Sequence, residues 1–297
     1  MRVTDLSNAL AEAVEAAGRS VVRVERRGRD VSGAVLSAEG DVMAINHTVE
    51  GDELEIGLPD GGTTKARVVG RDPSTDLALL KAESGSFVPA PWADLDNARV
   101  GHLVLGIYRP GRTARATFGV VAALGDAWRT RSGGKIDRYL EASLPLPPGF
   151  SGGLMVDASG NALGLSTSGL LRGVALGIPA STVKRVGEAL RTNGRVRRGY
   201  LGVGSYPVAL SAPLPSTPAQ HTGLLIISVQ PESPASRAGL LLGDVVVGVG
   251  GTPTTQPADL LPALDEDQVG REITLRIVRA GEVRDLRVTV GERGRPA

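Results

Sequence analysis

The sequence contains no cysteine, which excludes disulfide frameworks, thiolate metal sites and cysteine nucleophiles. Histidine is almost as scarce: the chain has three, His47, His102 and His221, and their spacing matches no pattern of zinc ligands. No run reaches the roughly 18 consecutive apolar residues that a membrane-spanning helix requires. These absences lead us to expect no metal, no cofactor and no membrane span.

An excess of charge of one sign is also missing. The 297 residues include 33 basic and 32 acidic ones, so the formal net charge is +1 and no global field attracts nucleic acid. The N-terminus does not read as a signal peptide, because Glu12 and Glu15 interrupt its only apolar stretch. As it stands the chain is expected to be cytoplasmic, and periplasmic or otherwise extracytoplasmic if a leader has been removed.

Aromatic residues make up only 3% of the chain, whereas glycine occurs 40 times and proline 19 times. Turns therefore cut the chain into short segments. Apart from helices predicted at 4–18 and 181–191, short β-branched runs recur over about 160 residues, which favours β-barrels or sandwiches. The predicted order is an N-terminal helical segment (1–19), a β-rich domain (20–190), a linker (191–199), a smaller β domain (200–292) and a tail (293–297).

The smaller domain carries two short predicted helices, near 233–238 and at 257–264, and a Ser/Pro-rich tract at 211–218 that is predicted to be a loop. The linker contains four arginines. We interpret them as solvated rather than as a nucleic-acid patch, because no aromatic residues are interleaved among them.

The segment Gly149-Phe150-Ser151-Gly152-Gly153 is the most specific local pattern in the sequence. Flanking glycines let the backbone turn so that the Ser151 hydroxyl is presented, while the amides of Gly149 and Ser151 converge on one point. Converging amides of this kind stabilise the oxyanion of a tetrahedral intermediate. The alternative is a glycine-rich hairpin that carries an ordinary serine, and the motif alone leaves it open.

A serine nucleophile needs a base, and the base needs a carboxylate that orients it. His47 directly follows the apolar run 42–45, at the kind of strand end where a fixed scaffold exposes a side chain. Asp76 stands before the apolar run 77–80, where a buried carboxylate needs a partner such as an imidazole N–H. A turn-capping role is the alternative for Asp76, and His102 and His221 are expected to be surface residues.

These residues stand in an order that is itself informative. His47, Asp76 and Ser151 follow one another as in chymotrypsin-like proteases. The resemblance to the HtrA/Deg family of serine proteases is carried by the blocks 42–51, 72–81, 148–153, 177–180, 199–203, 231–235 and 238–246. Together these blocks resemble that family over most of the chain, from about residue 20 to residue 291.

The resemblance implies a mainly β protein, with a chymotrypsin-like double β-barrel followed by a PDZ domain and the active site between the barrels. Ser151 would be the nucleophile, His47 the general base and Asp76 the residue that orients it. The amides of Gly149 and Ser151 would form the oxyanion hole. A loop of the PDZ domain would bind the carboxylate of a peptide that adds as a strand to the sheet edge, and its residues would be Tyr200, Leu201, Gly202 and Val203.

The resemblance also implies an activity: an ATP-independent serine endopeptidase that degrades unfolded or damaged proteins through an acyl-enzyme. Its partners would be unfolded polypeptides and peptides with hydrophobic C-termini, and a homotrimer is expected by family analogy. Phe150 and Leu154 stand where the family usually has Asn and Pro, and we expect Phe150 to crowd or reshape the substrate cleft. The alternatives are a catalytically silent adaptor or holdase, which Phe150 favours, and an esterase with the same triad.

Overall fold

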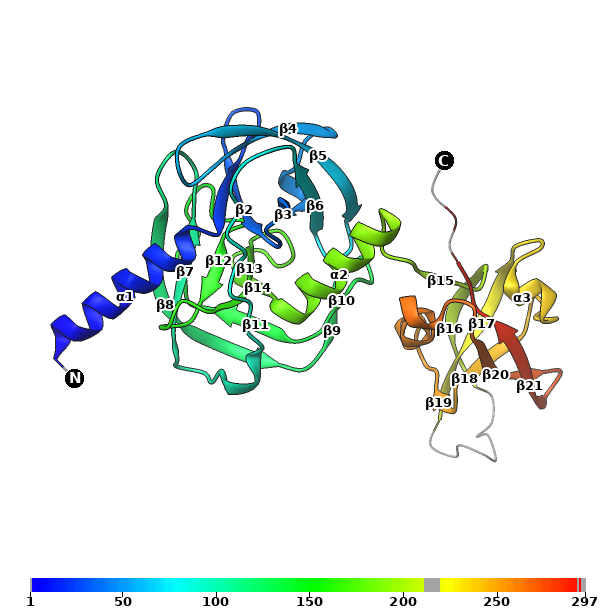
Figure 1. Cartoon of the computed structure of the whole chain (residues 1–297). Helices are drawn as coiled ribbons and strands as arrows, with labels where there is room; N and C mark the ends of the chain where they lie inside the picture. Colours follow the sequence, from blue (N-terminus) through cyan, green and yellow to red (C-terminus); the bar gives the residue numbers. More distant parts are fainter. Residues whose placement is uncertain (1, 211–219, 293, 295–297) are drawn as a thin grey trace. The chain divides into compact units, whose positions relative to one another are not determined.

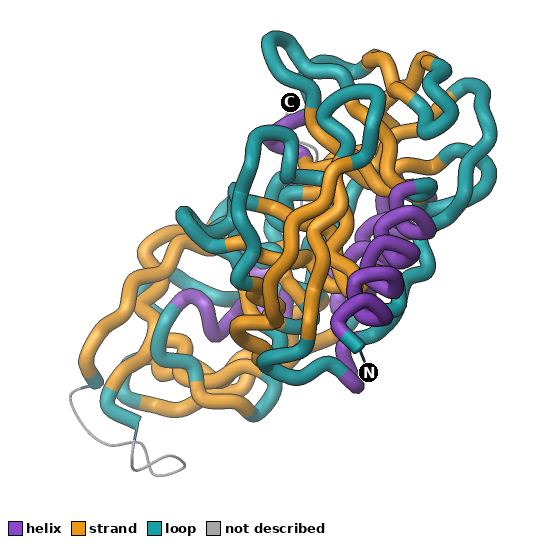
Figure 2. The backbone as a smooth tube through the Cα atoms, turned by 90° about the vertical axis from the view of Figure 1, so that its left-hand side faces the viewer, coloured by secondary structure: helices purple, strands orange, loops and turns teal. Residues whose placement is uncertain are grey.

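The computed structural model describes residues 2–210, 220–292 and 294, which form two compact units that meet in the sequence between Val196 and Arg197 (Figure 1). The Ser/Pro-rich tract at 211–218 lies outside the described residues, and so does the predicted tail at 293–297 except for Gly294. Strands dominate both units and few helical segments interrupt them, as the tube in Figure 2 shows. The prediction of a mainly β protein is therefore confirmed.

The first unit contains, nearest to its N-terminus, a closed six-stranded antiparallel barrel. In the order β1-β2-β3-β6-β5-β4, it consists of β1 (Val21–Val24), β2 (Val31–Val35), β3 (Asp41–Ile45), β4 (Glu53–Gly57), β5 (Thr63–Asp72) and β6 (Leu77–Ala82). Its interior is filled by side chains such as Val22, Val42, Ile56 and Phe87. Branched aliphatic residues of this kind pack well on a pleated, curved surface, which is why these runs form strands.

A second closed barrel follows in the same unit. In the order β11-β14-β13-β12-β7-β8, it consists of β7 (Leu103–Tyr108), β8 (Arg115–Gly125), β11 (Tyr139–Ala142), β12 (Leu154–Val156), β13 (Ala162–Thr167) and β14 (Ala175–Pro179). A separate two-stranded pair, β9 (Trp128–Arg129) and β10 (Lys135–Ile136), comes between β8 and β11 in the sequence. Leu140, Phe150 and Met155 lie in the core of this second barrel.

The two barrels share an apolar junction. Ile45 and Leu79 of the first barrel are buried in the same cluster as Ile107 and Leu165 of the second. Strands covered on both faces show no alternation of burial, and every residue of β2, β3 and β14 is buried. Close packing at this junction holds the end of β3 and the start of β6 in a fixed position relative to the loop before β12.

Two α-helices cover the junction. The predicted N-terminal helix is α1 (Val3–Gly18), next to the N label in Figure 2, and it buries Ala13 and Ala17 in the shared cluster. α2 (Ala180–Asn193) contributes Val183 and Leu190 to the same cluster and extends two residues past the predicted end of that helix, into the predicted linker. The short 3₁₀-helices are η1 (Asn46–Thr48) and η2 (Leu95–Asn97). None of the described helices has both the length and the apolar character needed to cross a membrane.

The second unit is a smaller β domain around its own core of Leu224, Ile226, Ile277 and Val288. Its main sheet has the order β16-β17-β18-β20-β21, with β19 beside β18, and β15 pairs with β22. The elements are β15 (Gly199–Tyr200), β16 (Val203–Ala209), β17 (Thr222–Val229), α3 (Pro234–Arg237), β18 (Val245–Val249), β19 (Thr252–Pro253), η3 (Pro257–Leu264), η4 (Glu266–Gln268), β20 (Glu272–Arg279), β21 (Glu282–Thr289) and β22 (Gly291–Glu292). Two barrels followed by a small sheet are the architecture that the resemblance implied.

Two details of the second unit follow from single residues. The predicted helix at 257–264 is the 3₁₀-helix η3, because Pro262 inside it lacks the N–H that an α-helix needs. Arg279 donates two hydrogen bonds of 2.7 Å to Asp244, which ties the end of β20 to the start of β18. Burial alone would raise the pKa of Asp244, but the hydrogen bonds from Arg279 and the Leu241 amide outweigh it and hold that pKa below its ordinary value.

Candidate active site

Strand pairing brings His47 and Asp76 together although 29 residues separate them in the sequence. β3 and β6 are antiparallel neighbours in which Ile45 pairs with Leu77, so the end of β3 lies beside the start of β6. His47 is the second residue after the end of β3, and Asp76 directly precedes β6. The Asn46 N–H donates to the Asp76 carbonyl at 2.8 Å and ties the two loops together. Apolar strands thus position both polar side chains.

Asp76 is only 5% exposed, and the contacts of its carboxylate favour one histidine tautomer. Its Oδ1 accepts from the His47 backbone N–H at 3.0 Å, while Oδ2 lies 2.8 Å from His47 Nδ1 and accepts from the Thr167 hydroxyl at 3.1 Å. An ionised carboxylate only accepts hydrogen bonds, so this network assigns the proton to Nδ1. The lone pair of Nε2 is then free to take a proton.

The turn before β6 is braced by a different carboxylate. Asp72 accepts from the N–H and the hydroxyl of Ser74 and from the Thr75 hydroxyl. Asp76 has a φ of 62°, in the left-handed region that aspartate adopts more readily than most residues. The turn-capping role that the sequence left open for Asp76 is therefore performed by Asp72, and the Asp76 carboxylate is directed to His47.

Gly169 lies against the His47–Asp76 pair from the second barrel. A Cβ built on Gly169 would stand 2.6 Å from His47 Nδ1 and 2.8 Å from Asp76 Oδ2, closer than van der Waals contact allows. The Gly169 N–H donates at 3.0 Å to the Thr167 hydroxyl, which itself donates to Asp76. Thr167 at the end of β13, with Ser168 and Gly169 after it, thus covers one side of the His47 imidazole.

Ser151 lies on the loop between β11 and β12, in a backbone turn that requires glycine. Gly149 and Gly152 have φ values of 85° and 87°, in the left-handed region. A Cβ on Gly152 would stand 1.8 Å from the Ser32 carbonyl oxygen, so the approach of β2 also excludes a side chain there. This explains physically why glycines flank the serine.

Hydrogen bonds hold the carbonyl groups of this loop. The Gly149 carbonyl accepts from the Ser32 hydroxyl at 2.8 Å, the Phe150 carbonyl from the Ser166 hydroxyl at 2.7 Å, and the Ser151 carbonyl from the Ser32 N–H at 3.2 Å. Because the C=O and N–H of a trans peptide point in opposite directions, the held Phe150 carbonyl fixes the direction of the Ser151 amide. Within the described part of the chain, the N–H groups of Gly149 and Ser151 donate to no acceptor. Two such unpaired donors beside a serine hydroxyl suit an oxyanion hole.

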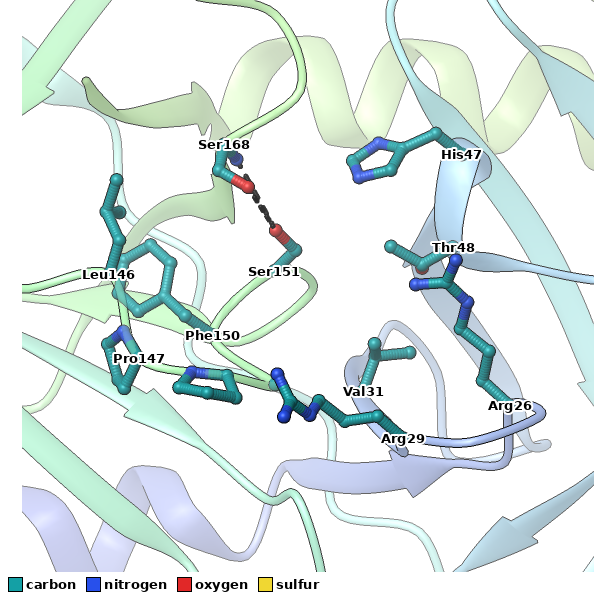
Figure 3. Close-up of a pocket in the computed structure, with 12 residues that line it drawn as sticks. Arg26, Arg29, Val31, His47, Thr48, Leu146, Pro147, Phe150, Ser151 and Ser168 are labelled. Atoms are coloured by element: carbon teal, nitrogen blue, oxygen red, sulfur yellow. Dashed lines mark hydrogen bonds between the residues drawn. The ribbon is translucent and has the colours of Figure 1, made fainter. Parts of the chain in front are cut away.

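His47, Gly149 and Ser151 line one pocket of about 320 Å³ (Figure 3). The Ser151 hydroxyl lies 3.1 Å from the Ser168 hydroxyl and accepts from the Ser168 N–H at 3.4 Å. His47 faces Ser151 across the pocket, and no hydrogen bond between these two side chains is present among the described residues. The pair His47–Asp76 is assembled, whereas the Ser151 hydroxyl has to turn away from Ser168 before Nε2 can take its proton.

Sequence reasoning missed several residues that shape this pocket. Ser166, Thr167, Ser168 and Gly169 form a run of small residues at the end of an apolar strand, and that run was the only available signal. Ser32 had no signal, because its contacts with the Ser151 loop cross from one barrel to the other.

Ser32 belongs to a buried network that reaches α1. The Ser32 hydroxyl accepts a hydrogen bond from the backbone N–H of Arg109 at 2.8 Å. Arg109 is 5% exposed, and its guanidinium donates to the carbonyls of Gly18, Val21 and Arg112. Burial lowers the pKa of Arg109 from its ordinary value, and the three carbonyls replace the water that the charge has lost.

Replacing Ser32 with alanine is expected to lower kcat for peptide hydrolysis about 10-fold with little change in KM. Deleting an oxyanion donor costs about 10²–10³ in kcat, and this substitution only loosens the backbone of Gly149, whose amide is expected to be such a donor. The half-buried Gly149 carbonyl and the buried Arg109 backbone N–H each lose a partner, which costs about 1–3 kcal/mol of stability. Steady-state kinetics and a thermal melt of one preparation measure both effects.

Ser20 provides the matched control for this substitution. Its side chain is also buried in the first unit, at 1% exposure, but its hydroxyl has no hydrogen-bond partner among the residues that the structure describes. Ser20→Ala therefore removes a buried hydroxyl without touching the Ser151 loop, and kcat should stay at the wild-type value. Equal losses of kcat in the two variants would contradict a positioning role for Ser32.

The structure changes the interpretation of Phe150. Its side chain is 2% exposed and packs in the core of the second barrel, with its ring centroid 6.4 Å from that of Tyr108. A Cβ on Gly106 would stand 2.9 Å from the Phe150 ring, so the ring fills the space that this glycine leaves. Almost no surface of the ring is left to crowd the cleft, which removes the sequence feature that favoured a silent adaptor.

In the second unit, the predicted carboxylate-binding loop connects β15 with β16. It contains Tyr200, Leu201, Gly202 and Val203. The N–H groups of Leu201 and Gly202 donate to no acceptor among the described residues. β16 is hydrogen-bonded to β17 alone in the main sheet, so its other edge is available to a peptide strand.

The remaining histidines are not among the residues that line the pocket. His102 and His221 are exposed, as predicted, and His102 accepts from Arg99 Nε at 3.1 Å. Among the described residues, no group of three or more His, Asp or Glu side chains is arranged to hold a metal ion.

Family models match both units. Residues 31–165 match a trypsin-like peptidase domain, and residues 189–290 match a PDZ domain. The first match contains His47, Asp76 and Ser151, and the second contains the β15–β16 loop.

Curated relatives are similar over most of this chain. A "probable periplasmic serine endoprotease DegP-like" of Brucella suis is 34% identical over 275 residues, which cover 90% of this chain and 53% of the relative. A protein of Halomonas elongata with the same description is 32% identical over 268 residues, covering 88% of this chain and 56% of its own length. The chain spans about half the length of the curated relatives it matches.

Solved structures are similar over nearly the whole chain. The structure titled "HtrA-type protease AlgW with tripeptide" has a TM-score of 0.75 and 30% sequence identity, covering 97% of this chain and 98% of that one. A serine endoprotease from Yersinia pestis has a TM-score of 0.76 and 26% identity, covering 96% of this chain and 98% of that one.

Proposed function

Because the chain belongs to the HtrA family of proteases, we propose that it is an ATP-independent serine endopeptidase that degrades unfolded or damaged proteins. One observation carries this proposal. The buried Asp76 holds His47 in the tautomer that can accept a proton, and that imidazole shares a pocket with Ser151 and two unpaired amides. These are the parts that acyl transfer requires.

The proposed reaction begins when Ser151 Oγ turns toward His47 and attacks the carbonyl carbon of the scissile bond. Its proton passes to His47 Nε2, and Asp76 stabilises the resulting imidazolium. The amides of Gly149 and Ser151 donate to the oxyanion of the tetrahedral intermediate. His47 returns the proton to the leaving amine, the C–N bond breaks, and the acyl group stays on Ser151 Oγ. Water, deprotonated by His47, then hydrolyses the ester and frees Ser151.

The PDZ domain is proposed to bind the C-termini of peptides with a hydrophobic last residue. The unpaired amides of Leu201 and Gly202 support this, since backbone N–H groups of such a loop can receive a terminal carboxylate while the peptide pairs with β16. The PDZ domain would in this way either deliver substrate to the peptidase domain or regulate the activity of that domain.

Two further parts of the proposal rest on relatives. The curated relatives are described as periplasmic, which favours the extracytoplasmic of the two compartments that the sequence left open. The homotrimer rests on family analogy alone, and sedimentation velocity of the purified protein tests it.

The test of the proposed function is labelling with a fluorophosphonate probe, followed by turnover of casein with and without a peptide that ends in a hydrophobic residue. The probe reacts with an activated serine without presuming a substrate, and mass spectrometry of the digest should place the label on Ser151. Casein should be cut, and pre-labelling should abolish the cutting. Heat-denatured protein is the control for non-specific labelling.

The alternatives predict different results. A catalytically silent adaptor would take no label and cut no casein while still binding peptide through the PDZ domain. An esterase would take the label and hydrolyse small esters but leave casein intact. Either result would overturn the proposal.

A further inference from the structure

Two arginines of the loop between β1 and β2 line the pocket that contains Ser151. Arg26 and Arg29 extend into it from the first barrel (Figure 3). Arg26 Nε donates to Glu50 at 3.0 Å, so its charge is balanced. Arg29 is exposed and has no hydrogen bond or ion pair with any residue that the structure describes. Arg29 is thus a cation in the pocket wall without a partner in the described part of the chain.

No carboxylate of the pocket offsets Arg29. None of the twelve described residues that line it is acidic. Asp30, the next residue, is engaged with Arg23 at 3.1 Å. A pocket whose charged groups have one sign attracts ligand groups of the opposite sign. The wall around Arg29 therefore favours an anionic group of the substrate.

Proton transfer indicates which part of the substrate meets this wall. His47 has to give its proton to the leaving amine, so the segment after the scissile bond begins beside His47. Arg26 and Arg29 belong to the same barrel as His47, whereas Ser168 lies on the other side of Ser151 in Figure 3. The leaving segment consequently passes along the wall that carries Arg29, and the acyl segment lies toward Ser168.

We propose that Arg29 is a specificity-determining residue that selects substrates with aspartate or glutamate among the first three residues after the scissile bond. This inference rests on the proposed peptidase function and names the substrate class of the same pocket. An extended peptide advances about 3.3 Å per residue, so three residues cover about 10 Å of this wall. Guanidinium and carboxylate pair through charge-assisted, often bidentate hydrogen bonds.

The test compares matched fluorogenic peptides. Cleavage sites in a denatured protein are first mapped by mass spectrometry. One sequence is then synthesised with Glu, Gln or Lys at the first, second or third position after the cut in turn. The Glu peptide should have a kcat/KM about 5-fold above the Gln peptide at low ionic strength, the upper range for an exposed ion pair. About 0.5 M salt should reduce this preference, because the paired charges are exposed to solvent.

Substitutions at Arg29 should then change the ratio of kcat/KM between the Glu, Gln and Lys peptides, with little effect on cleavage of the Gln peptide. Arg29→Gln should make the Glu and Gln peptides equivalent, and Arg29→Glu should favour the Lys peptide. Arg27→Gln is the matched control, since Arg27 is exposed in the same loop and loses the same charge but does not line this pocket. That control should keep the wild-type preference for Glu.

The outcomes separate this inference from the proposed function. Equal kcat/KM for the Glu and Gln peptides in the wild-type protein, with the Gln peptide cut and the fluorophosphonate label taken up, would overturn the role of Arg29 and leave the peptidase intact. If the Arg27 and Arg29 variants lost the preference for Glu equally, the preference would depend only on the net charge of the protein. That result would also overturn the inference. Absence of labelling and of cleavage for every peptide would overturn the proposed function itself.

Discussion

Ser151→Ala is expected to lower kcat for peptide hydrolysis about 10⁶-fold, the loss seen when a nucleophilic serine that acts as one unit with its base is removed. Alanine lacks the oxygen that forms the acyl bond. The amides of Gly149 and Ser151 do not depend on that oxygen, so substrate binding and some transition-state stabilisation should survive. Single-turnover kinetics with excess enzyme, together with fluorophosphonate labelling, measure the loss.

Thermal stability and peptide binding by the PDZ domain are the controls for the Ser151→Ala variant. The Ser151 hydroxyl has only Ser168 as a hydrogen-bond partner in the described structure, and both residues face solvent at the pocket. The thermal midpoint and the binding of a C-terminal peptide to the PDZ domain should therefore match the wild type. A residual kcat within about 10-fold of the wild type would show that another group is the nucleophile.

Asp76→Asn is expected to lower kcat about 10⁴-fold at neutral pH with KM nearly unchanged. An amide in the place of the carboxylate can donate toward His47 Nδ1, which then becomes the acceptor and moves the proton to Nε2. In that tautomer His47 cannot take the Ser151 proton. Asparagine adopts the left-handed φ of 62° found at position 76 almost as readily as aspartate, so the backbone of the turn should be kept.

An aspartate that caps a turn outside the pocket provides the control, because its substitution shows what the loss of a turn-capping carboxylate alone does to kcat. Asp157 accepts from the N–H groups of Ser159 and Asn161 and does not line the pocket. Asp157→Asn should change stability by no more than about 1 kcal/mol and leave kcat at the wild-type value. A comparable fall of kcat in both variants would mean that Asp76 acts through the fold rather than through His47.

The residues of the pocket that could be predicted from the sequence are those that belong to a recognisable local sequence pattern. The glycines around Ser151 are required by backbone φ values and by the approach of β2, so a short motif records them. His47 and Asp76 stand at adjacent ends of two paired apolar strands, β3 and β6, and the apolar runs indicated where those strands end and begin. The β-rich architecture was predictable for the same reason, since many of the strands are short apolar runs bounded by turn residues. The double barrel itself was implied by the resemblance to the family.

Contacts that depend on the packing of one barrel against the other were not predictable. Ser32 reaches the Ser151 loop only because β2 lies beside it in three dimensions, and nothing around Ser32 in the sequence indicates this. The hydrogen bond of Ser151 with Ser168 depends on a side-chain rotamer, which a residue pattern does not specify. The departure from the family pattern at Phe150 led to a wrong expectation, because a large residue beside the serine can turn inward where Gly106 leaves room.

The close approach of Gly169 to His47 and Asp76 has a consequence for how such proteins lose activity. Any side chain at position 169 has to displace the imidazole or the carboxylate, so one substitution outside the three reactive residues can silence the site. The resulting protein would keep the full triad in its sequence, the same barrels and the same PDZ domain. A genome survey that counts intact triads would therefore include such silent descendants among the proteases, and the residue at this position would tell them apart.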